Sequence, residues 1–106
     1  MHKVKITINP CDDKQKELLY FCRVITDQTL QKAGCSSSGV LLDKNHIILD
    51  QQWEHFNLLE DYFRSDPFTA LLGAMKFLGK NYEVTIDNGT GKDGMIMVET
   101  ARPKYL

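Results

Sequence analysis

The thiol of Cys35 is the side chain in this sequence best placed to act as a nucleophile. It lies in a loop rich in glycine and serine, from Gly34 to Gly39, where a thiol would be accessible to a substrate. A Cys–His pair would take its histidine from a distant part of the chain, and His46 and His55 are the candidates. No neighbouring base or helix start activates the thiol, so the sequence favours an unreactive cysteine.

Acidic and aromatic residues gather near the middle of the chain, where they could form a binding surface for a basic partner. Glu54 and Asp61 are seven residues apart and would share one face of a helix, with Glu60 beside them. Trp53 and Tyr62 supply the aromatic groups that protein interfaces favour. We take these five as candidate partner-binding residues. An ordinary solvated helix face is the alternative interpretation.

Two further chemistries lack the spacing that they require. The histidines and cysteines form no Cys-x-x-Cys or His-x-x-x-His pair, so we expect no metal site. The segment 89–92, Gly-Thr-Gly-Lys, has a glycine–lysine pair without the spacing of a phosphate-binding loop, and a hairpin loop explains it better. The sequence therefore assigns no catalytic residue, no metal and no cofactor.

Length and composition indicate one globular domain over residues 1–106. The chain is 42% hydrophobic and 25% charged, which suffices for a core without disulfides or metal. Its net charge of −1 argues against nonspecific nucleic-acid binding, which needs a basic face. The three cysteines do not resemble a disulfide framework, and no apolar run is long enough for a signal peptide or a membrane span. We expect a cytoplasmic protein with reduced thiols.

The clearest predicted element is a helix over residues 65–80. Ser65 is a suitable N-cap, and Asp66 and Pro67 suit the first turn. Apolar residues then recur at helical spacing and predict a broad buried face. These residues are Phe68, Ala70, Leu71, Leu72, Ala74, Met75, Phe77 and Leu78.

The N-terminal half favours strands. Residues 3–9 alternate between polar and apolar and predict a half-buried strand that Pro10 ends. Residues 18–25 are apolar on both faces except for Arg23, and we interpret them as a central strand paired with the first. Residues 27–39 contain a helical turn or a loop. Residues 40–49 fit either a hairpin around Asp43 to Asn45 or one bulged strand.

Two segments remain. Asp50 resembles an N-cap, and near-helical spacing of aromatic residues predicts a helix from about Gln51 to Arg64. Residues 82–86 and 95–100 predict a hairpin with a glycine-rich loop, while continuation of the helix through residue 86 is the competing interpretation. The expected fold is α+β, with a mostly antiparallel sheet of four to six strands and one or two helices packed on one face.

The stretch from Asp66 to Gly79 resembles a helix found in many small bacterial proteins, with Asp, Pro, Phe and then x-Ala-Leu before an amphipathic run. In those proteins it follows several antiparallel strands. The whole chain is similar to immunity proteins that neutralise polymorphic or contact-dependent growth inhibition toxins. This resemblance implies a non-enzymatic toxin inhibitor whose partner is a cognate toxin domain, and it transfers no binding residue.

Two other functions stay open from the sequence. One is a small cytoplasmic enzyme or ligand-binding domain with a pocket between sheet and helices, with Cys35 or a histidine at its mouth. The other is a structural homodimer joined through sheet edges. Neither involves a membrane or direct nucleic-acid binding.

Overall fold

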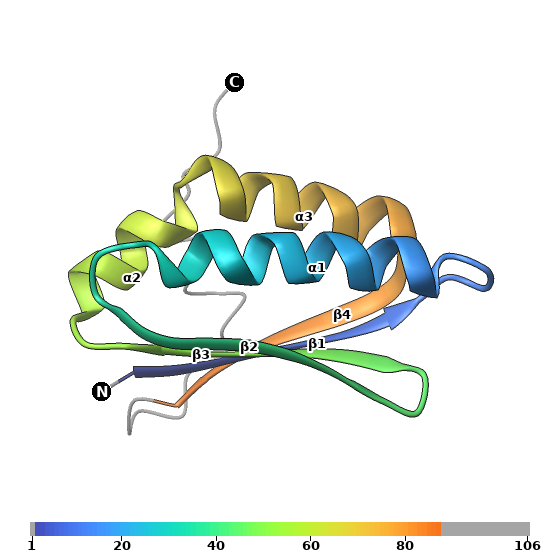
Figure 1. Cartoon of the computed structure of the whole chain (residues 1–106), viewed down its shortest axis with the longest axis horizontal. Helices are drawn as coiled ribbons and strands as arrows, with labels where there is room; N and C mark the ends of the chain where they lie inside the picture. The colour runs from blue at the N-terminus through green and yellow to red at the C-terminus, as the bar shows by residue number, and fades with distance from the viewer. Residues whose placement is uncertain (1, 88–106) are drawn as a thin grey trace.

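The structure, a computed structural model, describes residues 2–87 (Figure 1). Four strands and three helices occupy this part of the chain. They are β1 (His2–Pro10), α1 (Gln15–Leu30), β2 (Cys35–Asp43), β3 (His46–Trp53), α2 (Phe56–Phe63), α3 (Asp66–Leu78) and β4 (Gly79–Asp87). The predicted loop at 88–94 and the predicted strand at 95–100 lie outside the described residues.

The four strands form one antiparallel sheet in the order β2-β3-β1-β4. Ile6 of β1 faces Leu49 of β3 on one side and Val84 of β4 on the other. With α2 and α3 together in the place of the second helix, this is the β-α-β-β-α-β arrangement of ferredoxin-like folds. The α+β class and the antiparallel sheet are therefore confirmed, and the described residues hold three helices where one or two were expected.

The helices lie on one face of the sheet, and α1 and α3 run side by side there (Figure 1). Every second residue of β1 points toward them, so Val4, Ile6 and Ile8 are buried while Lys3 and Lys5 are exposed. The core is built from apolar side chains of the sheet and of all three helices. No helix within residues 2–87 is long and apolar enough to cross a membrane.

Helix α3 forms where the sequence predicts it. The hydroxyl of Ser65 accepts a hydrogen bond from the backbone N–H of Phe68, as expected of an N-cap. Phe68, Leu71 and Met75 are buried. Phe77, which we assigned to the core, is 85% exposed because it projects from the opposite side of the helix. The predicted apolar stripe was therefore too wide.

Residues 18–25 belong to helix α1, so their prediction as a central strand was wrong. Leu18, Cys22, Ile25 and Thr29 are buried at spacings of four, three and four, which is a helical period. β1 consequently pairs with β3 and β4. Because Thr29 is polar, the helical period of this buried face is missed when only apolar residues are considered.

The predicted helix over 51–64 is also partly wrong. Residues 51–53 continue β3, and helix α2 begins only at Phe56. Ile47, Leu49, Gln51 and Trp53 point inward with the period of a strand. The predicted hairpin over 40–49 is confirmed, since Asp43 pairs with His46 at the turn between β2 and β3. Residues 82–86 lie in strand β4 and do not extend the preceding helix.

Candidate functional site

Four side chains with polar atoms meet in the interior between α1, β3 and α2. They are Thr29, Gln51, Trp53 and Tyr62, each no more than 2% exposed. The indole Nε1 of Trp53 donates to Oε1 of Gln51 at 3.1 Å, and Nε2 of Gln51 donates to the Tyr62 hydroxyl at 3.1 Å. Tyr62 and Thr29 lie 3.2 Å apart through their hydroxyl oxygens. We call these four residues the Tyr62 network.

The direction of every hydrogen bond in the Tyr62 network follows from its two ends. An indole N–H can only donate, so the Gln51 carbonyl oxygen must face Trp53 and its amide nitrogen must face Tyr62. The hydroxyl of Thr29 donates to the backbone carbonyl of Ile25 at 2.7 Å. Because that proton is used, Tyr62 must donate to Thr29. The Tyr62 hydroxyl thus has its proton committed inside the protein.

The aromatic rings of the network are packed together. The Trp53 and Tyr62 ring centroids lie 4.8 Å apart at an interplanar angle of 32°, and Phe68 meets Tyr62 edge-on at 5.2 Å. Burial raises the pKa of the Tyr62 hydroxyl, while its hydrogen bonds with Thr29 and Gln51 act in the opposite direction. The phenol is therefore neutral at physiological pH.

A surface pocket of about 180 Å³ opens above Trp53 and Tyr62. Ala33 and Leu58 line its apolar sides. Because Trp53 and Tyr62 are buried and the other lining residues are at least partly exposed, these two residues lie at the floor of the hollow. We call this hollow the Trp53 pocket. It lies between the end of α1 and helix α2, which are more than twenty residues apart in the sequence.

Gly34 shapes the turn that forms one side of this pocket. Its φ of +87° lies in the left-handed region, which glycine adopts without strain. A Cβ atom at this position would lie 2.5 Å from Cδ1 of Leu58. The backbone N–H of Glu54 also donates to the Gly34 carbonyl at 2.8 Å. The turn therefore fits closely between α2 and the end of β3.

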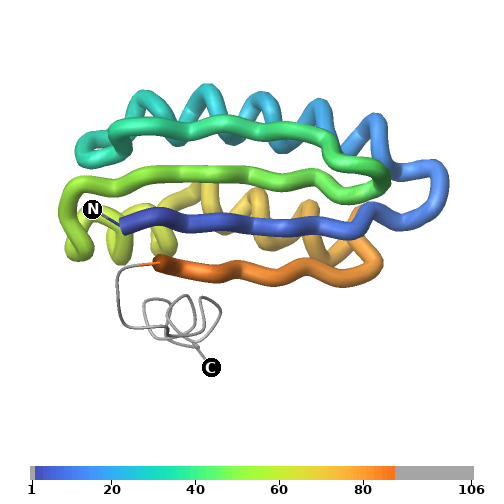
Figure 2. Tube along the Cα trace, turned by 90° about the horizontal axis from the view of Figure 1, so that it is seen from below, coloured from blue at the N-terminus to red at the C-terminus, as the bar shows by residue number. Residues whose placement is uncertain are grey.

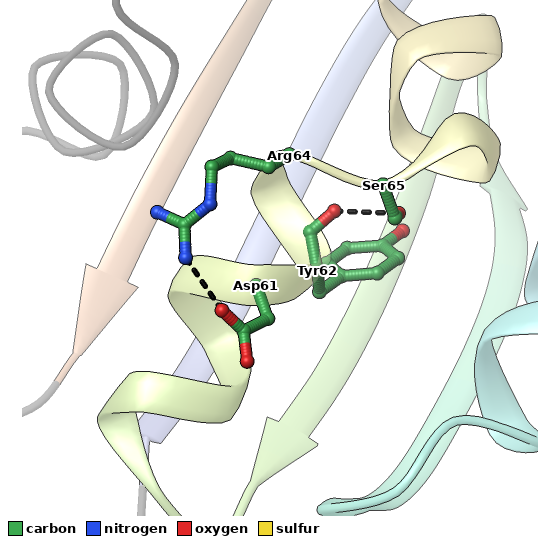
Figure 3. Close-up of polar contacts among 4 residues, drawn as sticks. All are labelled: Asp61, Tyr62, Arg64 and Ser65. Atoms are coloured by element: carbon green, nitrogen blue, oxygen red, sulfur yellow. Dashed lines mark hydrogen bonds and ion pairs between the residues drawn. The ribbon is translucent and has the colours of Figure 1, made fainter.

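The rim of the Trp53 pocket carries Lys32, Asp61 and Ser65. Asp61 forms an ion pair with Arg64, and Figure 3 shows these two side chains pointing toward each other and away from the Tyr62 ring. The Ser65 hydroxyl donates to the backbone carbonyl of Tyr62 at 2.6 Å. Lys32 is exposed, and no carboxylate within residues 2–87 forms an ion pair with it.

Two larger hollows lie elsewhere among residues 2–87, and only Gln51 of the Tyr62 network lines either of them. One, of about 480 Å³, lies on the sheet face away from the helices, among exposed side chains such as Lys3, Lys5 and Asp50. The other, of about 290 Å³, lies near Asp12 and Lys80, which form an ion pair at 2.7 Å. The Trp53 pocket is smaller, but two residues of the Tyr62 network, Trp53 and Tyr62, line it.

The five candidate partner-binding residues are divided by the structure. Trp53 and Tyr62 are buried, whereas Glu54 and Asp61 are exposed and Glu60 is half-buried. They do not form the single acidic and aromatic face that we expected from one helix, because Trp53 and Glu54 precede α2. No observation tests whether these five residues bind a partner protein, so that role stays a prediction.

The candidate pair of Cys35 and His46 is not assembled. His46 lies at the opposite end of the β2–β3 hairpin from Cys35, which faces Trp53. The Cys35 thiol donates to the carbonyl of Ser37 at 3.3 Å, and partial burial raises its pKa. A thiol with a raised pKa is a weak nucleophile at neutral pH. Within residues 2–87, no three His, Cys, Asp or Glu side chains come together to hold a metal ion.

Thr29 and Gln51 were missed from the sequence. Neither belongs to a motif, and Thr29 meets Tyr62 across 33 positions of the chain. The one local signal for Gln51 is its place in the inward-facing series of β3, which continues through Trp53.

Solved structures with the same fold come from several bacteria. An antibiotic biosynthesis monooxygenase has a TM-score of 0.75 and 17% identity, with 85% of this chain and 99% of that chain covered. A proposed antibiotic biosynthesis monooxygenase from Deinococcus radiodurans has a TM-score of 0.78 and 18% identity, covering 87% and 95%. Rv0793 from Mycobacterium tuberculosis has a TM-score of 0.77 and 15% identity, covering 86% and 96%. No protein-family model and no curated protein sequence matches the chain.

These neighbours overturn the interpretation drawn from residues 66–79. They are proteins of the antibiotic biosynthesis monooxygenase fold, not immunity proteins of contact-dependent inhibition systems. The toxin-inhibitor hypothesis and the non-enzymatic role were therefore wrong. The physical reason is that a capped helix with one apolar face serves any α+β domain that must cover a sheet. The alternative of a small enzyme or ligand-binding domain agrees better with these neighbours.

Proposed function

We propose that this chain is a small enzyme of the antibiotic biosynthesis monooxygenase type that binds its substrate in the Trp53 pocket. The observation that carries this proposal is the Tyr62 network beneath the pocket. Buried polar side chains hold one another in fixed positions when their hydrogen bonds are made, so this network fixes Trp53 and Tyr62 beneath the pocket. A pocket with convergent polar and aromatic groups is the usual form of a small-molecule site.

The names of the structural neighbours supply the reaction type. Two of them are named antibiotic biosynthesis monooxygenases, one of these as a proposal. A monooxygenase transfers one atom of dioxygen to its substrate, and the other atom leaves as water after it takes up two electrons and two protons, which the substrate itself or an external reductant must supply. In the Trp53 pocket, a small apolar substrate would lie against Ala33 and Leu58, above the buried side chains of Trp53 and Tyr62. The Gln51 amide would fix the position of both rings.

Ligand binding is the first step to test, and the chain supplies its own reporter because Trp53 is its only tryptophan. Small aromatic compounds that enter the pocket should change the Trp53 fluorescence in a saturable manner. Ala33→Leu, which places a larger side chain in the pocket wall, should weaken that response. Ala70→Leu makes the same change at an exposed position of α3 and should leave the response intact.

Turnover is tested with the compounds that bind. Incubation under ¹⁸O₂ should give a product that contains one labelled oxygen atom, at a rate that falls in the Ala33→Leu variant. If compounds bind but no labelled product forms, the chain is a ligand-binding domain and the oxygenase proposal is wrong. If no compound gives a saturable fluorescence response, the Trp53 pocket is not a ligand site.

Two further expectations are kept as part of this proposal. The three free cysteines, one of them buried, suit a reducing compartment such as the cytoplasm. A homodimer through sheet edges would have to avoid β2, because α1 runs along that edge of the sheet (Figure 2). Light scattering would measure whether the chain associates at all.

A further inference from the structure

We infer that the Trp53 pocket takes a single-ring aromatic carboxylate, with the ring over Trp53 and Tyr62 and the carboxylate at Lys32. This inference rests on the proposed function, because it names the substrate class of the same site. Three observations carry it: the size of the pocket, the state of its polar side chains and the charge on its rim.

The size of the pocket matches a ligand with one aromatic ring. An apolar cavity of about 150 Å³ holds one benzene molecule. The Trp53 pocket, at about 180 Å³, therefore has room for one ring and a small substituent. Its apolar sides, Ala33 and Leu58, suit an apolar ring that lies above the buried residues Trp53 and Tyr62.

The interior of the pocket offers no free side-chain proton to a ligand. The Trp53 indole N–H is bound to Gln51, and the Tyr62 hydroxyl donates to Thr29. The Ser65 hydroxyl donates to the backbone carbonyl of Tyr62. A polar substituent that needs a donor must therefore lie at the rim, where the Lys32 ammonium has three N–H groups.

The rim charge decides between an anionic and a cationic substituent. The Asp61 carboxylate is neutralised by its ion pair with Arg64. Lys32 has no ion-pair partner within residues 2–87, so it leaves one uncompensated positive charge among the residues that line the pocket. A carboxylate would pair with that ammonium, whereas an amine would meet it as a like charge.

The test compares three probes that share one ring and differ in charge: benzoate, benzyl alcohol and benzylamine. Their affinities for the full chain are measured by Trp53 fluorescence at low salt, where exposed charges are screened least. Benzoate should bind most tightly and benzylamine most weakly. Lys32→Met should lower benzoate affinity by about two- to fivefold, as expected for an exposed ion pair. It should leave benzyl alcohol unchanged, and Lys32→Arg should retain benzoate binding.

The possible failures can be told apart. If benzyl alcohol or benzylamine binds as tightly as benzoate, or if Lys32→Met binds benzoate as the parent does, the carboxylate assignment is wrong while the pocket stands. If a compound with two fused rings binds in the pocket more tightly than benzoate, the assignment of a single-ring ligand is wrong. If no probe gives a response that Ala33→Leu weakens, the proposed function fails together with this inference.

Discussion

The indole Nε1 of Trp53 donates to Oε1 of Gln51 across 3.1 Å, and this contact sets the direction of the whole Tyr62 network. Because the Gln51 carbonyl is held by the indole, the amide nitrogen faces the Tyr62 hydroxyl. That hydroxyl in turn donates to Thr29. The Trp53 indole N–H at one end can only donate, and the backbone carbonyl of Ile25 at the other end can only accept. The hydrogen bonds between them can therefore run in one direction only.

Replacement of Gln51 with leucine should destabilise the fold by about 1–3 kcal/mol, because the buried Trp53 indole N–H loses its partner. Urea denaturation followed by circular dichroism measures the change. Gln52→Leu is the matched control, since Gln52 is adjacent on β3 and is only half-buried. It should change the stability by no more than about 0.5 kcal/mol. Equal effects of the two variants would contradict the structural role of Gln51.

Helix α3 offers a second matched pair. Leu71 is fully buried, so Leu71→Ala should cost about 2–5 kcal/mol. Phe77 is 85% exposed, and Phe77→Ala should therefore be nearly neutral, within about 0.5 kcal/mol. The urea midpoints of both variants give the comparison. A large loss of stability from Phe77→Ala would show that this side chain is covered in solution.

Stability should fall as the pH rises from about 9 to about 12, because of Cys22. Burial raises the pKa of this thiol from 9.0 to about 12. In that interval the unfolded chain ionises the thiol while the folded chain keeps the proton, so rising pH favours unfolding. The slope contributed by this group is at most about 1.4 kcal/mol per pH unit. Below about pH 8 the thiol is almost fully protonated in both states and contributes no slope.

The measurement is the free energy of unfolding at several alkaline pH values, for the parent and for Cys22→Val. The variant should show a shallower decline between pH 9 and 10. Ionisation of the tyrosines and of the other thiols contributes to the slope of both proteins, so the difference between the two slopes reports on Cys22. The absolute stability of the variant is irrelevant to the test, since only the slope reports on the thiol. Parallel curves for the two proteins would mean that Cys22 is not held in a buried, neutral form.

The sequence predicted those elements whose local signals agree. In α3, the N-cap Ser65, the early Pro67 and the buried series from Phe68 all favour one helix. In β1, strict alternation indicates a strand with one buried face. These signals act within a few residues, so they do not require knowledge of the tertiary structure.

The two wrongly predicted elements, residues 18–25 and residues 51–53, share a physical cause, which is a polar residue in a buried position. In α1, Thr26 and Thr29 interrupt the apolar stripe, while the β-branched and aromatic residues between Tyr20 and Ile25 favour a strand. In β3, Gln51 occupies a buried position, so the alternation of apolar and polar residues that predicts a strand is interrupted there. Such residues are tolerated because distant partners complete their hydrogen bonds, and those partners could not be predicted from local spacing. The same residues form the candidate site.

The most direct test of the central claim is an NMR titration of the Trp53 indole N–H with benzoate. The chain has one tryptophan, so this group gives a single signal, and the residue lies at the floor of the Trp53 pocket. We predict a saturable shift of that signal in the parent and a much weaker one in Ala33→Leu, with Ala70→Leu behaving as the parent. An indole signal that stays unmoved in the parent, or that shifts equally in Ala33→Leu, would contradict a ligand site above Trp53 and Tyr62.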